Sequence, residues 1–284
     1  MPIVRHADPD AFLAASAPAL AHNAAAASLL RAIALGVKRR PPASDERVYL
    51  ATLHHGDAAA AAVQRADHGL MVEAAEPRLA AFFADDIADE HPALQGVGGT
   101  LAACETFARR WRDRTARAHV MRVHLRHHVL TDVAPVAQAQ GRMRAATDAD
   151  LDWLLDASLA FVAEAGMPDS PAQVRRNVPL FHAQGRYRIW DDGERAAFAG
   201  WSDAGEGDAR VGPVYTPPAM REHGYATALV AALSRELIAA GRQRLFLTTD
   251  VANPTSNAIY ARIGYRSVSD FYHFDFVPAP SACL

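Results

Sequence analysis

The stretch Val211–Ala226, V-G-P-V-Y-T-P-P-A-M-R-E-H-G-Y-A, decides how the second half of this 284-residue chain folds. Its first five residues, up to Tyr215, form an apolar run typical of a buried strand. The two prolines that follow end the strand, because proline has no amide donor and its φ is fixed. After Gly224, apolar residues recur at helical spacing as far as Gly241, a residue typical of a helix end. The stretch therefore predicts a strand, a tight loop and a helix.

Such a loop suits an anion. The first amide groups of a helix have no intrahelical partner, and the helix dipole adds partial positive charge there. A phosphate binds well at this position. Gly224 lets a ligand approach the main chain, and Arg221 adds a full positive charge. The plain alternative is an ordinary helix start with a glycine in its turn.

A second motif follows about thirty residues later. The run 244–250 (R-L-F-L-T-T-D) is typical of a strand. Asn253 and Pro254 then have the character of a helix cap and a first helical residue. The helix that they open (T-S-N-A-I-Y-A-R-I-G-Y) ends at Gly264, and Tyr265 begins another strand.

Together, the two motifs resemble those of the GCN5-related N-acetyltransferases (GNAT superfamily). In that family an R-x-x-G-x-A loop, here Arg221–Ala226, holds the diphosphate of coenzyme A. The family's second motif has its counterpart, in order and spacing, in Asn253, Ser256, Tyr260, Gly264 and Tyr265. The resemblance covers residues 142–276 and implies the α/β GNAT fold, with a mixed central sheet flanked by helices.

The pattern before these motifs agrees with the family's order. It predicts a strand at 142–146, helices at 149–165 and 171–183, a hairpin of 187–190 with 195–202, and a polar loop at 203–208. The first half predicts helices at 22–35, 77–90 and 100–118 and strands at 47–53, 68–73 and 119–133. The alanine run between the first two strands is ambiguous. This half resembles, more faintly, the degenerate first repeat of tandem GNAT proteins. We therefore expect a degenerate GNAT-like domain at 1–137 and a catalytic domain at 138–284.

A glycine-rich stretch, Gln95–Thr100, is expected where the first repeat would have its phosphate loop. Gln95, Gly98 and Thr100 approach the form Q-x-x-G-x-A. However, no apolar strand precedes the stretch, and no second motif follows it. A decayed repeat retained for packing is favoured over a second coenzyme site.

Composition excludes several classes of function. The net charge of −3 gives no general attraction to nucleic acid or to an anionic membrane. The apolar run 11–21 lacks the basic start of a signal peptide, and no stretch is long enough to span a membrane. Cys104 and Cys283 are too few for a disulfide framework, which favours the cytoplasm. The arginines of 109–117 and the histidines at 54, 55, 124, 127 and 128 are interpreted as solvated side chains. No metal site is expected.

The resemblance implies that acetyl-CoA is the cosubstrate and assigns residues to it. The diphosphate would be held by Arg221, Glu222, His223, Gly224, Tyr225 and Ala226. Val214 and Tyr215 would pair with the amides of the pantetheine arm, which enters where two parallel strands separate. Asn253 and Ser256 would also contact the cofactor, although the Asn253 side chain has the alternative of capping its own helix.

Two residues are candidates for catalysis. Tyr260 matches the family residue that protonates the departing CoA thiolate, and a phenol is protonated at neutral pH. Its alternative is a tyrosine that only fills space. Glu164, at the end of the 149–165 helix, is the candidate general base. A solvent-facing glutamate, or a water chain to the amine, is the alternative.

The expected function is direct transfer of an acetyl group from acetyl-CoA to a small-molecule or peptide amine, without nucleic acid or membrane partners. Neither cysteine lies in the motif region, which agrees with transfer that forms no covalent enzyme intermediate. Two alternatives use related folds. One is a non-catalytic CoA-binding or regulatory module, and the other is an aminoacyl-tRNA-dependent transferase, which the absence of a basic stripe disfavours.

Overall fold

The computed structural model describes residues 3–42, 46–65, 68–167 and 169–278. The chain forms two compact units, each interrupted in sequence. The first consists of the described residues of Met1–His127, Thr248–Ala252 and Val268–Leu284. The second consists of His128–Leu247 and Asn253–Ser267. The sequence division at 137 and 138 stays a prediction about the repeats. The compact units follow a different division, because the first also includes residues from near the end of the chain.

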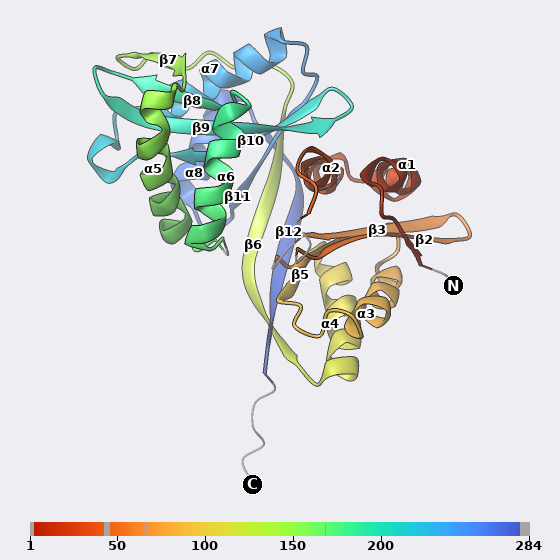
Figure 1. The fold of residues 1–284 in the computed structure, drawn as a ribbon. Helices are drawn as coiled ribbons and strands as arrows, with labels where there is room; N and C mark the ends of the chain where they lie inside the picture. The colour runs from red at the N-terminus through yellow and green to blue at the C-terminus, as the bar shows by residue number, and fades with distance from the viewer. Residues whose placement is uncertain (1–2, 43–45, 66–67, 168, 279–284) are drawn as a thin grey trace. The chain divides into compact units, whose positions relative to one another are not determined.

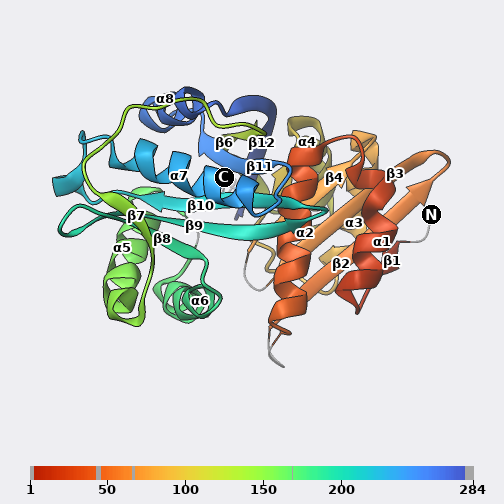
Figure 2. The ribbon, with the colours of Figure 1, turned by 90° about the horizontal axis from the view of Figure 1, so that it is seen from above.

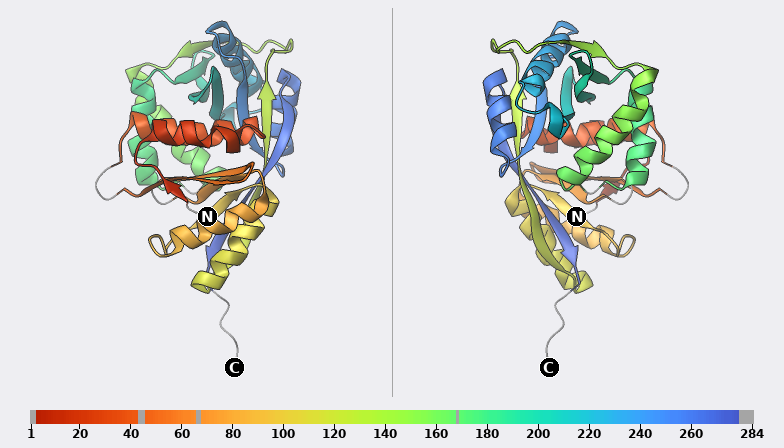
Figure 3. Two further views of the ribbon diagram at one scale, coloured as in Figure 1. Left: turned by 90° about the vertical axis from the view of Figure 1, so that its right-hand side faces the viewer. Right: turned by 90° about the vertical axis from the view of Figure 1, so that its left-hand side faces the viewer.

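In the first unit a twisted sheet separates two pairs of helices (Figures 1 and 3). Its strands lie in the order β1-β2-β3-β4-β5-β12-β6. They are β1 (Val4–Arg5), β2 (Val48–His55), β3 (Ala58–Arg65), β4 (Leu70–Ala74), β5 (Gly96–Gly99), β6 (Ala118–Leu130) and β12 (Arg266–Val277). The helices are α1 (Pro9–Leu20), α2 (Ala24–Arg39), α3 (Ala80–Ala88), which follows the 3₁₀ turn η1 (Pro77–Leu79), and α4 (Leu101–Thr115).

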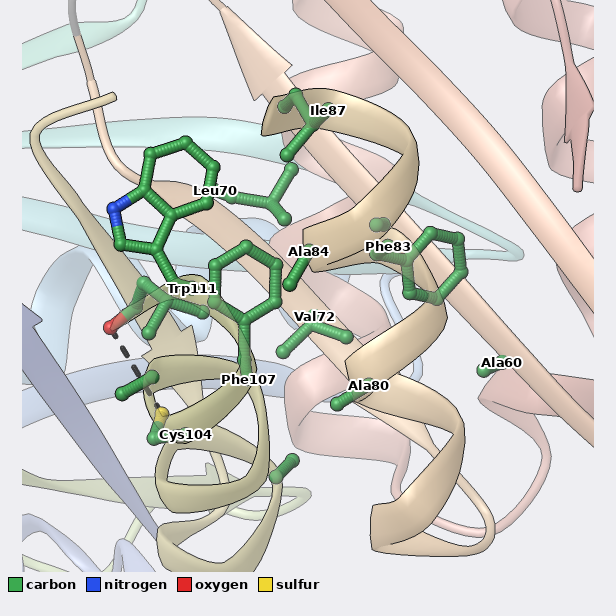
Figure 4. Close-up of a cluster of buried hydrophobic side chains, with 14 of the residues drawn as sticks. Ala60, Leu70, Val72, Ala80, Phe83, Ala84, Ile87, Cys104, Phe107 and Trp111 are labelled. Carbon is green, nitrogen blue, oxygen red and sulfur yellow. Dashed lines mark hydrogen bonds between the residues drawn. The ribbon is translucent and has the colours of Figure 1, made fainter. Parts of the chain in front are cut away.

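Each face of this sheet has its own apolar core. Helices α1 and α2 cover one face, where Phe12, Leu20 and Leu30 are buried. Helices α3 and α4 cover the other, with the cluster drawn in Figure 4. There Trp111 of α4 stacks on Phe276 of β12, with 5.2 Å between ring centroids. The last strand of the chain therefore completes the core of the first unit.

The second unit has a mixed sheet with helices on both faces (Figure 2). Its strands lie in the order β11-β10-β9-β8-β7. They are β7 (Arg142–Ala145), β8 (Tyr187–Asp191), β9 (Arg195–Gly205), β10 (Asp208–Tyr215) and β11 (Leu245–Asp250), whose residues from Thr248 onward belong to the first unit. Helices α5 (Leu151–Glu164) and α6 (Pro171–Ala183) cover one face, and α7 (Tyr225–Ala239) and α8 (Pro254–Ile263) the other. Short 3₁₀ turns, η2 (Asp148–Asp150) and η3 (Pro218–Met220), precede α5 and α7.

Both units contain the same succession of a strand, a helix, a parallel strand and a second helix. In the second unit this is β10, α7, β11 and α8, and in the first it is β4, α3, β5 and α4. The glycine-rich stretch was expected at the position of the first repeat's phosphate loop, and this placement is wrong. Gly96–Gly99 is strand β5, and Thr100 caps α4. The counterpart of the phosphate loop is the turn at residues 75–77.

Glycine is needed in β5 because neighbouring strands approach it closely. A Cβ atom on Gly99 would lie 2.6 Å from the Val72 carbonyl oxygen of β4, and one on Gly96 would lie 2.2 Å from the Phe274 carbonyl oxygen of β12. Strands β4 and β5 therefore remain in close contact to the end of their parallel ladder. A packing role, not a ligand, accounts for these glycines.

Other sequence expectations also need correction. The ambiguous alanine run is strand β3, and most of the expected polar loop at 203–208 belongs to β9 and β10. His127 and His128 are buried, with exposed fractions of 1% and 5%, and are not solvated. His127 lies 2.8 Å from the Thr248 hydroxyl, and His128 is near the Ser267 hydroxyl. His54 and His55 are exposed as expected.

Among the described residues, none of the helices combines the length and the apolar character that crossing a bilayer requires.

Glu73 gives the first unit a pH-dependent stability. Burial raises the pKa of this β4 carboxyl to about 7, and a hydrogen bond with Asn23 offsets only part of that rise. The folded protein thus binds more protons than the unfolded chain between pH 4.5 and 7, so the free energy of unfolding falls as pH rises through this range. A shift of this size corresponds to about 3 kcal/mol. We expect Glu73→Gln to raise the Tm at pH 8 and to leave it nearly unchanged at pH 4.5.

Glu46 provides a control of opposite sign. Burial opposes its ionisation, but hydrogen bonds from Arg65 and Arg40 outweigh burial and lower the pKa of Glu46 to about 2. Its stabilising effect is present above about pH 4.5 and is lost as pH falls towards 2. Glu46→Gln should therefore lower the Tm at pH 8. Equal Tm values for wild type and Glu73→Gln at pH 8 would contradict the assignment to Glu73.

Candidate functional site

Strand β10 is paired along most of its length on one side and only briefly on the other. Against β9 it forms an antiparallel ladder from Asp208 to Tyr215, with a bulge between Val211 and Val214. Against β11 its parallel pairs are Ala209 with Leu245 and Arg210 with Phe246. Within the described residues, Val211 to Tyr215 have no ladder partner on the β11 side. The polar main-chain groups of this segment are thus available to a ligand with amide groups.

The turn after β10 places an exposed main chain beside these groups. Pro218–Met220 form one turn of 3₁₀ helix, and two residues with left-handed backbone follow: Glu222 with φ 70° and Gly224 with φ 80°. Residues 221–224 are all exposed. A glycine accepts the left-handed conformation at little cost, so the chain can reverse here and begin α7.

The start of α7 differs from most other helix starts in the protein. Side chains of Asp8, Asn23, Thr100, Ser170 and Asn253 cap α1, α2, α4, α6 and α8. Gly224 has no side chain with which to cap α7. The first internal bond of the helix runs from the Ala228 amide to the Gly224 carbonyl. The amides of Tyr225, Ala226 and Thr227 consequently have no partner among the described contacts, and they favour an anion.

A second turn of the chain holds this helix start in place. The Tyr225 hydroxyl donates to Asp192 Oδ2 at 2.5 Å, in the turn between β8 and β9. His223 stacks on Tyr225 with 5.4 Å between ring centroids, and its Nδ1 lies 2.6 Å from the Arg221 carbonyl oxygen. No local signal in the sequence indicates the contact between Asp192 and Tyr225.

Arg221 has a carboxylate partner that the sequence did not indicate. Its Nη2 donates to Glu164 Oε2 at 2.6 Å, and its Nε donates to the Thr216 carbonyl at 3.0 Å. The other oxygen of Glu164 accepts the Tyr215 hydroxyl at 2.5 Å. These hydrogen bonds, from Tyr215 first and then Arg221, lower the pKa of Glu164. A carboxylate that is harder to protonate is a weaker base, so this arrangement does not favour Glu164 as the general base.

Helix α8 carries the remaining predicted residues. The Asn253 side chain accepts the Ser256 amide at 3.0 Å, so it caps its own helix, the alternative considered from the sequence. Tyr260 is partly buried, and its ring meets that of Tyr265 edge-on at 5.9 Å between centroids. Burial raises the pKa of Tyr260 to about 12. The phenol therefore stays protonated at neutral pH and can act as a proton donor.

Other candidate groups near the strands have structural partners. Asp208, the one carboxylate of β10, is buried, and its two oxygens accept Nε and Nη2 of Arg244 at 2.9 and 2.6 Å. Burial raises the pKa of the Cys104 thiol to about 12, so it is not a thiolate nucleophile. Cys283 lies outside the described residues. No group of three or more His, Cys, Asp or Glu side chains within the described ranges is arranged to hold a metal ion.

Comparison with known proteins agrees with this geometry. A family model described as "Acetyltransferase (GNAT) family" matches residues 150–265, which include β10, its loop, α7, β11 and α8. Residues 150–265 form a GNAT domain. No curated protein matches the chain.

Several solved structures resemble almost the whole chain. A Drosophila protein is 17% identical, with a TM-score of 0.66 over 98% of this chain and 99% of its own. A tandem GNAT protein from the clavulanic acid biosynthesis pathway is 14% identical, with a TM-score of 0.60 over 99% of each chain. A GCN5-related N-acetyltransferase from Sphaerobacter thermophilus is 17% identical, with a TM-score of 0.59 over 96% of this chain and 95% of its own. These likenesses show that the fold is that of tandem GNAT proteins.

Within the GNAT domain, the predicted residues fall into connected groups. Val214 and Tyr215 end β10, the loop 221–224 follows, and Tyr225 and Ala226 start α7. Glu164 joins this group through Arg221 and Tyr215. Asn253, Ser256 and Tyr260 share α8 and its cap. Their roles toward a ligand remain predictions.

The first unit differs at the equivalent turn. After β4 the chain passes Glu76, which pairs with Arg78 at 2.5 Å, and enters η1 and α3. This turn contains no glycine, and none of its residues has a left-handed backbone. The left-handed turn before the helix is therefore found after β10 and not after β4.

Gly224→Ala tests whether this turn receives an anion. The new Cβ would lie 4.0 Å from the nearest atom, Cβ of Ala139, so the direct cost is backbone strain of about 1 kcal/mol. We expect a Tm loss of a few degrees and a CoA affinity reduced about tenfold or more, because the methyl group covers the exposed amides. Thermal melting and calorimetric titration with CoA measure the two effects.

Gly185→Ala is the matched control. Gly185 also has a left-handed backbone, with φ 66°, and no atom lies within 4 Å of its added Cβ. It should lose similar stability and keep full CoA affinity. Equal affinity losses in the two variants would mean that the Gly224 turn is not a ligand site.

Proposed function

We propose that the protein transfers an acetyl group from acetyl-CoA to an amine within its GNAT domain. The proposal rests on the pairing of β10. The last residues of this strand have no ladder partner on the β11 side, and the turn after them leads to the start of α7, which no side chain caps. An extended ligand with amides at one end and a diphosphate at the other matches this succession. Coenzyme A has that structure.

The cofactor would lie along β10 and end at α7. Main-chain groups of Val214 and Tyr215 would pair with the pantetheine amides. The diphosphate would meet the amides of residues 222–226 and the Arg221 guanidinium, which forms charge-assisted bonds with phosphate oxygens. Asn253 would contribute its free amide NH₂, since its carbonyl oxygen already caps α8. Ser256 would lie beside it in the first turn.

The chemistry that we assign to the chain is direct acyl transfer. The uncharged amine attacks the thioester carbonyl carbon, and the C–S bond breaks as CoA leaves as a thiolate. Tyr260 would give its phenolic proton to this sulfur. Its raised pKa keeps the phenol protonated at neutral pH and also makes it a weaker acid than an exposed tyrosine. The proton lost by the amine would pass to water, because Glu164 is committed to Arg221 and Tyr215.

The acceptor that we propose is a small molecule or the amine of a peptide, with no nucleic acid or membrane partner and the cytoplasm as the expected compartment. Helices α5 and α6 and the loop between them would border the acceptor groove. The alternative of a non-catalytic CoA-binding module keeps the same cofactor contacts. Tyr260 favours the enzyme, because such a module has no use for a proton donor.

The function is tested by calorimetric titration with CoA, followed by CoA release from acetyl-CoA with a panel of amines, amino acids and antibiotics. We expect binding, and release stimulated by at least one amine. Binding without release by any amine would favour the non-catalytic module. Failure to bind CoA would contradict both.

Tyr260→Phe separates catalysis from packing. The change keeps the ring and removes one hydroxyl group, so acetyl-CoA affinity and Tm should remain close to wild type. If Tyr260 protonates the leaving sulfur, turnover of a reactive amine should fall about 10²–10⁴-fold. Equal losses in kcat and kcat/KM would indicate an interaction made only in the transition state.

Tyr265→Phe is the matched control for this variant. The ring of Tyr265 contacts that of Tyr260. The Tyr265 hydroxyl is buried and lies 3.1 Å from the Ser234 hydroxyl. Losing that hydrogen bond should lower the Tm and leave turnover within a few-fold of wild type. Unchanged turnover in Tyr260→Phe would remove Tyr260 from the mechanism.

A further inference from the structure

The positive charge of the phosphate loop is already neutralised inside the protein. Arg221 is the only arginine or lysine of the stretch 211–226. Its guanidinium is bound by Glu164 Oε2 at 2.6 Å and lies 5.8 Å from the centre of the Tyr215 ring. The carboxylate comes from the end of α5, 57 residues earlier in the chain. A diphosphate that uses Arg221 must therefore share it with this carboxylate or displace it.

The geometry favours displacement. The side chains of Arg221 and Glu164 are 46% and 44% exposed, and an ion pair in such a setting is weak because solvent screens it. Phosphate oxygens form stronger, two-pronged bonds with a guanidinium. The Nε bond to the Thr216 carbonyl would keep Arg221 beside the loop while its Nη groups exchange partners. Glu164 would retain its bond from the Tyr215 hydroxyl.

We propose that Glu164 competes with the diphosphate for Arg221: its carboxylate pairs with the guanidinium until CoA binds. The inference rests on the proposed function and gives Glu164 a role in setting the affinity for CoA instead of in proton transfer. Freeing Arg221 from Glu164 costs free energy for every ligand that binds the guanidinium, so the carboxylate lowers the affinity for CoA. A ligand without phosphate that does not contact Arg221, such as pantetheine, does not bear this cost.

Glu164→Gln tests the competition. Glutamine keeps the length of the side chain and its acceptor oxygen for Tyr215, and it removes the negative charge. We expect CoA to bind about three- to fivefold more tightly, because an exposed ion pair is worth up to about 1 kcal/mol. Pantetheine, which has no diphosphate, should bind the variant and wild type equally. In an Arg221→Gln background, the same change at Glu164 should have a much smaller effect on CoA affinity.

Glu236→Gln controls for net charge. Glu236 lies in the last turn of α7, at the end of that helix away from the loop, and pairs with Arg188. The substitution removes one negative charge, as Glu164→Gln does, but at a position away from the loop. CoA affinity should therefore stay within about twofold of wild type. Matched Tm values for wild type and Glu164→Gln would confirm that the loop region folds normally.

The outcomes separate this inference from the proposed function. Wild-type binding of CoA with equal or weaker binding by Glu164→Gln would overturn the competition and leave the cofactor site intact. Tighter binding of pantetheine as well as CoA would also overturn it, because the diphosphate would then not be the competing group. No CoA binding by wild type, Glu236→Gln and Glu164→Gln would overturn both.

Discussion

Strand β10 shares ladder pairs with β11 only at Ala209 and Arg210, so its last residues are held by β9 alone. A buried strand normally has both edges paired, because an unpaired amide or carbonyl costs free energy unless water or a ligand satisfies it. Here the unpaired segment lies next to an exposed turn and to a helix start that no side chain caps. The bulge at Gly212 and Pro213 lies in the same segment, and proline has no amide to leave unpaired.

The two units use the same succession of elements differently. In the first unit, glycines let β4, β5 and β12 approach closely, and the equivalent turn contains Glu76. In the second, Gly224 gives the turn its left-handed backbone. The helix starts after both turns have no capping side chain. The glycines thus serve strand packing in the first unit and the turn before the helix in the second.

Local signals in the sequence were sufficient for the GNAT domain. Gly224 and Asn253 mark helix starts through their own backbone and capping preferences, so the strands and helices around them were predicted well. Strand β5 was mistaken for a loop because its glycines are explained by neighbours distant in sequence, such as Phe274. The Ala58–Arg65 run was ambiguous, since alanine packs in either element. The contact of Glu164 with Arg221 and the placement of β12 in the first unit depend on tertiary structure, which no local pattern encodes.

Amide hydrogen exchange with and without CoA tests most directly the claim that the open edge of β10 and the start of α7 form the cofactor site. The account predicts that CoA slows exchange at Val214, Tyr215 and residues 225–227. It also predicts no change at Glu76–Leu79, the equivalent turn of the first unit. Protection confined to the first unit, or CoA binding without slower exchange at residues 225–227, would contradict the account.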